Sequence, residues 1–225
     1  MKTTDEAVVN GKLTNEALGA LTRKFDEIKR RVEGGTIPLK NTLNALQDII
    51  EGKVYNEYIN SHFAFIDQFN IVVPEGYTHP NRLTTFNQRY GGEFYFYDGD
   101  ITDQNFSAVS TVLIPGRKLR VKLFAIQKVV TSQDCLAIYK RHDAILAGAQ
   151  GGSLLYETSK DKLPKGKFYF SFDEKDRLWE DEDAGGDHKV PSVHHYSDGD
   201  WGFNLSDFDR GLTENDVLAV FCDCY

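Results

Sequence analysis

The chain has 225 residues, enough to bury a hydrophobic core without disulfides or a structural metal. Its 26 basic and 34 acidic side chains give a formal net charge of −8, which disfavours non-specific binding to nucleic acid and to anionic lipid. With 40% hydrophobic and 12% aromatic residues, the composition is that of a folded globular protein rather than a disordered one.

The N-terminal sequence and the cysteines indicate a soluble cytoplasmic protein. Residues 1–6 (MKTTDE) have neither the apolar core of a secretory signal nor the Arg-rich, acid-poor composition of a transit peptide. No run of about 18 apolar residues occurs, so we expect no membrane contact. The three cysteines are an odd number in a chain without an export signal, which favours reduced thiols over a disulfide framework.

Residues 1–12 are polar and are predicted to be a flexible lead-in, and residues 13–53 to be a helical hairpin. Thr14 suits the N-cap of a first helix that ends at Gly34-Gly35, and Pro38 suits the start of a second that ends at Gly52. The apolar positions of the first helix are three and four residues apart: Leu18, Leu21, Phe25, Ile28 and Val32. We expect the hairpin to bury Leu21, Phe25, Leu43 and Leu46.

Residues 54–225 are predicted to form a larger body, either separate from the hairpin or continuous with it. Its fold class is α+β: a mixed, mainly antiparallel sheet with two or three helices. In the first half of the body we expect helices over 54–67 and 81–89 and a further helix near Asp103, with strands over 69–73 and 93–98.

The middle of the body carries two clear local signals. Residues 118–128 alternate apolar and basic side chains, which predicts a half-buried strand. Thr131 and Asp134 resemble a capping box, which predicts a helix that runs to about His142. The glycine-rich segment 148–153 lacks the lysine of a phosphate-binding loop, and we interpret it as a turn before a strand at 153–157.

The C-terminal part reads as a series of strands, over 167–172, 190–196, 201–205 and 217–223. Asp198-Gly199 separates the second and third of these strands. Because Asp-Gly accepts the positive φ values of a tight turn, we expect a two-residue hairpin turn there.

A cluster of carboxylates and imidazoles near residues 181–195 contains the candidate metal ligands. These candidates are Asp181, Asp183, Asp187, His188 and His194. Segment 181–192 superficially resembles a calcium loop, but it lacks an oxygen ligand at its fifth position and the bidentate Glu at its twelfth. His194 and His195 are neighbours on a predicted strand, so their side chains should point to opposite faces. A solvated acidic loop is the simpler interpretation, and no cofactor is predicted.

Two other groups of residues, a cysteine pair and a basic strand, could bind a ligand. Cys222 and Cys224 would share one face of the last strand and could offer two thiolates to a soft metal, although buried free thiols are common in cores. The predicted strand at 118–128, with the residue before it, carries the cations Arg117, Lys118, Arg120 and Lys122, which could contact nucleic-acid phosphates. A charged solvent face of a strand explains the same pattern.

Three segments carry a family resemblance: residues 115–126 (PGRKLRVKLFAI), 172–179 (FDEKDRLW) and 197–203 (SDGDWGF). From about residue 70 onward, the chain resembles uncharacterised proteins predicted from bacterial genomes. The resemblance implies a bacterial or phage cytosolic protein. It implies no activity, cofactor or site residue.

The sequence contains no G-x-S-x-G, H-E-x-x-H or Walker motif. We therefore expect a non-enzymatic binding or accessory protein whose partner is a protein or a small ligand. The first alternative is a metal-dependent hydrolase or nuclease that uses the Asp/His cluster. The second is a nucleic-acid-binding protein that uses the basic strand, which the net charge disfavours.

Overall fold

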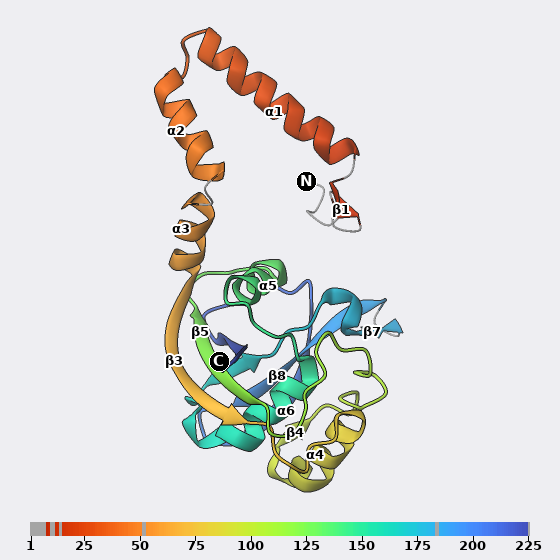
Figure 1. The fold of residues 1–225 in the computed structure, drawn as a ribbon. Helices are drawn as coiled ribbons and strands as arrows, with labels where there is room; N and C mark the ends of the chain where they lie inside the picture. Colours follow the sequence, from red (N-terminus) through yellow and green to blue (C-terminus); the bar gives the residue numbers. More distant parts are fainter. Residues whose placement is uncertain (1–7, 10–11, 14, 51–52, 183–184, 225) are drawn as a thin grey trace. The chain divides into compact units, whose positions relative to one another are not determined.

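A computed structural model describes the chain at residues 8–9, 12–13, 15–50, 53–182 and 185–224. The chain folds as two compact units, Met1–Glu57 and Tyr58–Tyr225. The boundary between the two units lies within helix α3 (Lys53–His62) (Figure 1).

Before α3, the first unit contains a pair of two-residue strands, β1 (Val8–Val9) and β2 (Lys12–Leu13), and then two helices, α1 (Asn15–Glu33) and α2 (Leu39–Ile50). Gly35 has a φ of 68°, and the N–H of Gly34 donates to the carbonyl of Arg30 at 2.9 Å. These features end α1 where the sequence predicted, because glycine adopts the left-handed conformation without strain. Both predicted helices are confirmed. The predicted N-cap, Thr14, and the predicted end of the second helix, Gly52, lie outside the described residues.

The predicted burial of the hairpin's apolar residues is wrong for this chain. Leu21, Phe25 and Leu43 are 46%, 48% and 55% exposed, Leu46 is only partly buried, and α2 buries none of its residues. Helices α1 and α2 do not enclose each other's apolar stripes, so most of these side chains stay in contact with solvent.

The second unit is built on a twisted sheet in which eight described strands take part. Seven run in the order β3-β5-β10-β6-β8-β9-β4, and β7 pairs with the start of β8. Only the pairs β10–β6 and β4–β9 are parallel, which makes the sheet mixed and mainly antiparallel. The strands are β3 (Phe63–Val72), β4 (Phe96–Tyr97), β5 (Lys118–Ile126), β6 (Lys167–Phe170), β7 (Trp179–Asp181), β8 (Asp187–His195), β9 (Trp201–Asp207) and β10 (Asp216–Asp223).

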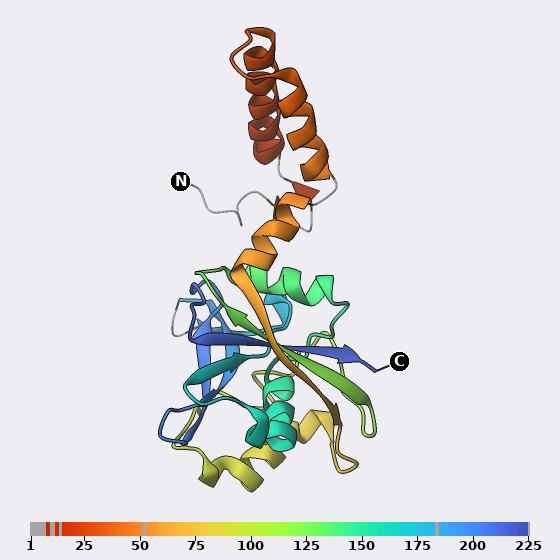
Figure 2. The same ribbon diagram turned by 90° about the vertical axis from the view of Figure 1, so that its left-hand side faces the viewer.

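Helices cover both faces of this sheet. Helix α5 (Ser132–Arg141) lies on one face, and α6 (Gly148–Ser159) with α4 (Arg82–Tyr90) lies on the other (Figure 2). The inner strand β10 is buried on both sides because its alternate side chains enter different core clusters. Leu218 packs in the cluster of α5, and Ala219 packs in the cluster of α6. The predicted α+β class is confirmed.

Short 3₁₀ turns complete the unit, at His79–Asn81, Gly91–Glu93, Lys160–Lys162 and Lys175–Arg177. The predicted capping box is present in full: Thr131 and Asp134 bond each other's backbone N–H groups at the start of α5. The predicted alternation in β5 is also confirmed, since Leu119, Val121 and Leu123 are buried on one face.

The predicted turn and strand over 148–157 are wrong, because this segment is the helix α6. Intrinsic propensity opposes a helix that contains three glycines, but here tertiary packing decides. A Cβ on Gly152 would lie 3.2 Å from the ring of Phe203, so only glycine lets the helix approach β9 this closely. Every residue from Gly148 to Tyr156 is buried.

Several predicted boundaries also differ from the structure. The helix expected over 54–67 ends at His62, and β3 begins immediately at Phe63, so the strand expected over 69–73 starts six residues earlier. The strand expected over 93–98 is limited to Phe96–Tyr97. The turn between β8 and β9 has three residues rather than two: Tyr196 pairs with Asp200 around residues 197–199, and Gly199 has the expected positive φ, 109°.

The helix expected near Asp103 is absent, because this side chain caps a different helix. Its two carboxylate oxygens accept the N–H groups of Leu83 and Thr84 at 2.8 and 2.9 Å. A negative charge at this point is favourable, since the first N–H groups of α4 have no partner within the helix.

Candidate functional site

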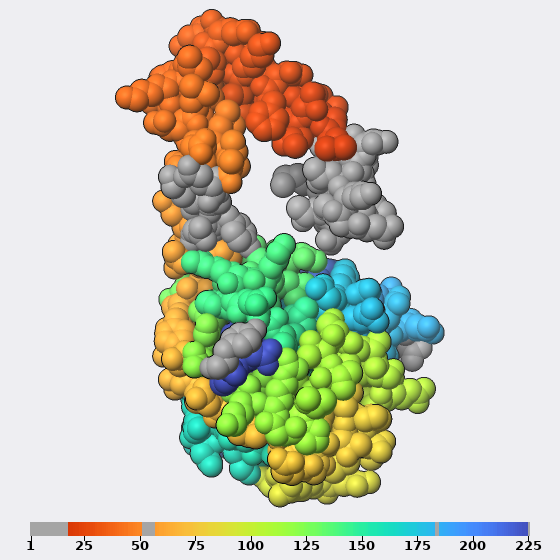
Figure 3. Space-filling view, in the orientation of Figure 1, coloured from red at the N-terminus to blue at the C-terminus, as the bar shows by residue number. Residues whose placement is uncertain are grey.

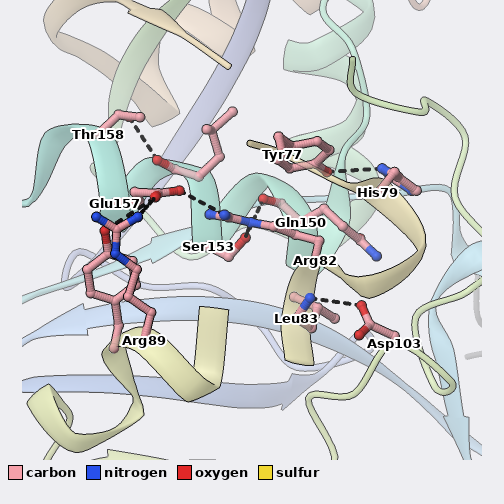
Figure 4. A network of polar contacts seen from close by, with 12 residues as sticks. Tyr77, His79, Arg82, Leu83, Arg89, Asp103, Gln150, Ser153, Glu157 and Thr158 are labelled. Carbon is pink, nitrogen blue, oxygen red and sulfur yellow. Dashed lines mark hydrogen bonds and ion pairs between the residues drawn. The ribbon is translucent and has the colours of Figure 1, made fainter. Parts of the chain in front are cut away.

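A largely buried polar network of the second unit joins α4 to α6 (Figure 4). Arg82 and Glu157 form an ion pair at 2.7 Å with side chains only 6% and 11% exposed. The Nε of Arg82 also donates to the hydroxyl of Ser153 at 2.7 Å, and that hydroxyl donates to the carbonyl of Gln150. A buried guanidinium requires such partners, because an unpaired charge in the interior is costly.

A small cavity of about 130 Å³ adjoins this pair. Arg89 and the hydroxyl of Tyr90 reach Glu157 at 3.3 and 3.2 Å, so two guanidinium groups surround one carboxylate. The Nη2 of Arg82 has no hydrogen-bond partner among the described residues. The charges of Arg82, Arg89 and Glu157 sum to +1, and the cavity beside them is large enough to hold water.

The rim of this network contains two groups with shifted pKa values. Burial raises the pKa of Tyr77, whose ring also lies 5.3 Å from the guanidinium of Arg82. Burial lowers the pKa of His79, and its Nδ1 lies 3.0 Å from the hydroxyl of Tyr77. Since the tyrosine stays protonated and the histidine neutral, the pair is a neutral hydrogen bond rather than an acid–base couple.

A second buried carboxylate, Asp173, lies beside the start of α6. It accepts hydrogen bonds from the hydroxyl and the N–H of Ser110 and from the N–H of Glu174. Burial raises its pKa, and these bonds oppose the rise. Asp173 thereby anchors the loop that carries Ser110 to the sheet.

The two adjacent histidines of β8 point to opposite faces, as predicted. The ring of His194 stacks on Phe168 at 3.6 Å. The ring of His195 stacks on Trp201 at 4.0 Å, and its Nδ1 lies 2.8 Å from the carbonyl of Leu163. Since only a protonated Nδ1 can donate to a carbonyl, the Nε2 of neutral His195 carries the lone pair. His195 lines an open pocket of about 390 Å³ together with Glu93, Tyr156, Lys160, Asp161, Lys165, Gly199 and Trp201.

The candidate metal ligands are only partly brought together. Asp181 and Asp187 lie opposite each other across β7 and β8, whereas Asp183 lies outside the described residues. His194 is seven residues farther along β8 than Asp187, which corresponds to roughly 23 Å. The Nδ1 of His188 faces the carbonyl of Leu178 at 3.4 Å. No three His, Cys, Asp or Glu side chains in the described part of the chain form a group that could hold a metal ion.

The thiols of Cys222, in β10, and of Cys224, just after this strand, lie in different environments. Cys222 is buried, its Sγ lies 3.6 Å from the carbonyl of His142, and burial raises its pKa. Cys224 is half-buried at the end of the chain, and its Sγ lies 3.8 Å from the Oδ1 of Asn70. The end of β10 reaches the molecular surface (Figure 3). A protonated, buried Cys222 is a poor nucleophile.

Three of the four predicted cations lie on one side of β5. Lys118 and Arg120 are exposed and Lys122 is half-buried, on the face of the sheet that carries α5. None of the three forms an ion pair with another described residue, although the Nζ of Lys122 lies 3.3 Å from the Nδ1 of His142. Arg117 differs, because Asp223 binds its guanidinium through both oxygens at 2.8 Å. The basic surface therefore has three members rather than four.

A regularly spaced group of exposed apolar side chains lies on the two helices of the first unit. We define the α1 stripe as Leu18, Leu21, Phe25, Ile28 and Val32, and the α2 stripe as Leu39, Leu43, Leu46 and Ile50. Six of these nine side chains are between 44% and 79% exposed, and so is the adjacent Ile49. Such a surface can bind another apolar surface.

Sequence reasoning identified the helical stripes and missed Arg82, Glu157 and the pocket of His195. Arg82 and Glu157 come from helices 75 positions apart in sequence, so no local pattern links them. One signal was present: a charged residue in a segment of mostly apolar or small residues, such as Glu157 after Leu154 and Leu155, requires a partner if the segment is buried.

No protein-family model, no curated protein and no solved structure matches this chain. The resemblance to uncharacterised bacterial proteins therefore stays a prediction. No described helix has both the length and the apolar character that crossing a membrane requires.

Proposed function

We propose that this protein is a non-enzymatic binding protein that associates with another protein through the α1 and α2 stripes. The observation that carries the proposal is the exposure of seven large apolar side chains within 33 residues, namely Leu18, Leu21, Phe25, Leu39, Leu43, Ile49 and Ile50. Exposed apolar surface of this extent is stabilised when a partner removes it from water.

The magnitude of the exposed area supports this function. A fully exposed large apolar side chain presents on the order of 150–200 Å², so these seven side chains present on the order of 600–800 Å² at their observed exposures. The largest apolar patch on a typical monomer is about 300–600 Å². One side of a standard protein–protein interface is about 800 Å². The exposed side chains of the stripes, together with the adjacent Ile49, thus have the area of an interface.

The second unit exposes eight large apolar side chains, but they belong to β3, the segment of β4 and two loops rather than to regularly spaced helical stripes. Its core clusters are enclosed by helices on both faces of the sheet. We therefore place the binding surface on the helices rather than on the sheet.

Site-specific photocrosslinking tests the proposed function. A photoreactive amino acid is placed at Leu43 on the α2 stripe and, as the matched control, at Asn44 beside it on the polar side of α2. We expect irradiation to give a covalent adduct of higher mass from position 43 and little from position 44. Crosslinks from position 43 that stay within one chain would contradict the proposal, because the stripe would then be covered by the chain itself.

A second candidate function, binding to nucleic-acid phosphates, is favoured by one observation: Lys118, Arg120 and Lys122 lie along one face of β5, and none of them forms an ion pair with a described acidic residue. Neutralising three phosphates would give a salt dependence of log K with a slope of about −2 to −3. A mobility-shift titration at several salt concentrations measures this slope. Substituting the three cations by Gln should abolish the shift, and a wild-type chain that does not bind at low salt would contradict this function.

A further inference from the structure

We propose that the partner of the stripes is a second copy of this chain, and that two α1–α2 hairpins form a four-helix bundle. This inference rests on the proposed function, since it names the protein that covers the same surface. Four observations support it: the spacing of the apolar residues, the incomplete burial of the stripes by only two helices, the exposed apolar area and the distribution of charge.

The spacing of the stripes specifies a helical partner. Successive members of the α1 stripe are three, four, three and four residues apart, and those of the α2 stripe are four, three and four apart. A strict alternation of three and four is the narrow seam by which helices pack against one another side by side. All nine positions are apolar, and each stripe therefore fits another helix that carries the same repeat.

Two helices alone leave this seam incomplete. The exposed members of the α1 stripe, such as Leu21 and Phe25, and the α2 residues Leu39 and Leu43 stay about half in solvent. Helix α2 has 12 residues and buries none of them, and isolated helices of this length are marginal in water. In a four-helix bundle, each stripe faces an interior that the other helices close. A second hairpin supplies the two helices that are missing.

The exposed area matches a dimer in particular. An isologous interface uses the same surface on both copies, so each copy contributes on the order of 600–800 Å² and the pair buries on the order of 1,200–1,600 Å². Stable, specific interfaces bury about 1,200–2,000 Å² in total. One further copy is therefore sufficient to cover the stripes.

The charge distribution permits two identical surfaces to meet. Like charges that face each other across a two-fold axis are destabilising, so a self-associating surface must keep charge away from its centre. Helix α2 has only two charged residues, Lys40 and Asp48, and neither belongs to its stripe. The charges of α1 also lie outside its stripe, where Glu27 already binds Arg30 and Arg31 at 2.7–2.8 Å.

Sedimentation of the full chain, with a matched pair of variants, tests the dimer. We expect the wild-type chain at tens of micromolar to have a mass of about 51 kDa, twice the 25.5 kDa of one copy. Leu43→Glu should shift the mass to that of a monomer, because it places a charge in the bundle interior. Asn44→Glu adds the same charge on the opposite side of α2 and should leave the dimer intact. Both positions are exposed in the single chain, so circular dichroism should show that both variants fold.

Three outcomes overturn the inference. A dimer that Leu43→Glu leaves intact would use another surface. A trimer or tetramer would show that more than one further copy is needed to cover the stripes. A wild-type chain that stays monomeric excludes self-association, and the photocrosslinks from position 43 then separate the two proposals. Crosslinks to a different protein would leave the proposed function standing. Crosslinks that all stay within one chain would show that the chain itself covers the stripe, and they would overturn both.

Discussion

The Nη1 of Arg82 on α4 lies 2.7 Å from the Oε2 of Glu157 on α6, and the two side chains are almost fully removed from solvent. This contact joins α4 to α6, and residues of both helices pack in the same core cluster. Each charge is tolerable only because the other is present, so the pair fixes where α4 lies on α6 even where it adds little net stability.

Removing one member of this pair should destabilise the second unit strongly. We expect Arg82→Met to lower the free energy of unfolding by about 3–5 kcal/mol, because Glu157 is left as a buried carboxylate with only Arg89 and Tyr90 nearby. Urea denaturation followed by tryptophan fluorescence measures the loss, since Trp201 packs against Tyr156 in the same core cluster.

The double variant Arg82→Met/Glu157→Leu distinguishes a buried charge from lost packing. It should recover most of the stability, since an apolar pair of similar volume replaces the ion pair without leaving a charge unpaired. As the control, Arg89→Met should cost less than about 1 kcal/mol, because the Arg89 side chain is 68% exposed. A double variant no more stable than Arg82→Met would show that the cost comes from shape rather than charge.

Glycine-to-alanine substitutions should have opposite effects in α6 and α1. In α6, a Cβ on Gly151 would lie 3.0 Å from the Cβ of Ala147 and 3.2 Å from the ring of Phe221, and closer still to the hydroxyl of Ser171. We expect Gly151→Ala to destabilise the second unit by about 1–3 kcal/mol in urea denaturation.

The matched variant Gly19→Ala has only the flexible end of Arg23 near its new methyl group, at 3.5 Å. Alanine is the better helix former, and the gain for α1 should be about 1 kcal/mol. Greater helicity by circular dichroism and slower amide exchange in α1 would show it. If Gly151→Ala and Gly19→Ala changed stability by the same amount and in the same direction, close packing would not be the reason why α6 has glycine at position 151.

Local patterns in the sequence were sufficient where one element determines its own structure. The spacing of the stripes predicted α1 and α2, the pair Thr131 and Asp134 predicted the start of α5, and alternation predicted β5. The helix α6 could not be predicted in this way, because three glycines oppose a helix until Phe203 and Phe221 surround it. The same limit applies to the ion pair of Arg82, which exists only once two distant helices meet.

The pairing of Arg117 with Asp223 should make stability depend on pH in acid. The guanidinium, mainly through its hydrogen bonds, holds the pKa of Asp223 below the ordinary 3.8. Because the folded-state pKa is the lower one, the stabilisation is present above pH 3.8 and is lost as the pH falls through the folded-state value. NMR titration should show the pKa of Asp223 rising toward 3.8 in Arg117→Met. An unchanged pKa would assign the shift to another group.

The acidic edge formed by β7 and β8 should not bind a divalent cation tightly, since a lysine already neutralises it. The Nζ of Lys189 lies 2.6 Å from Asp207 and 3.5 Å from Asp181, and its hydrogen bond to Asp207 is the main cause of its raised pKa. A metal ion would have to displace this ammonium group and then find further ligands. Calorimetric titration with Ca²⁺, Mn²⁺ or Zn²⁺ should therefore show no site tighter than about 10⁻⁵ M.

Removing the lysine tests this reason directly. In Lys189→Met, the carboxylates of Asp181 and Asp207 lose their shared counter-ion, so a weak affinity for Ca²⁺ should increase measurably over that of the wild type. Tight one-to-one binding by the wild-type chain that disappears in Asp187→Ala or His188→Ala would contradict this account, and it would favour a metal-dependent hydrolase instead. Binding that disappears only in Asp183→Ala would place the ligands in the segment outside the described residues. No binding by either chain would mean that the two carboxylates are too far apart, or too well solvated, to hold an ion even when the lysine is removed.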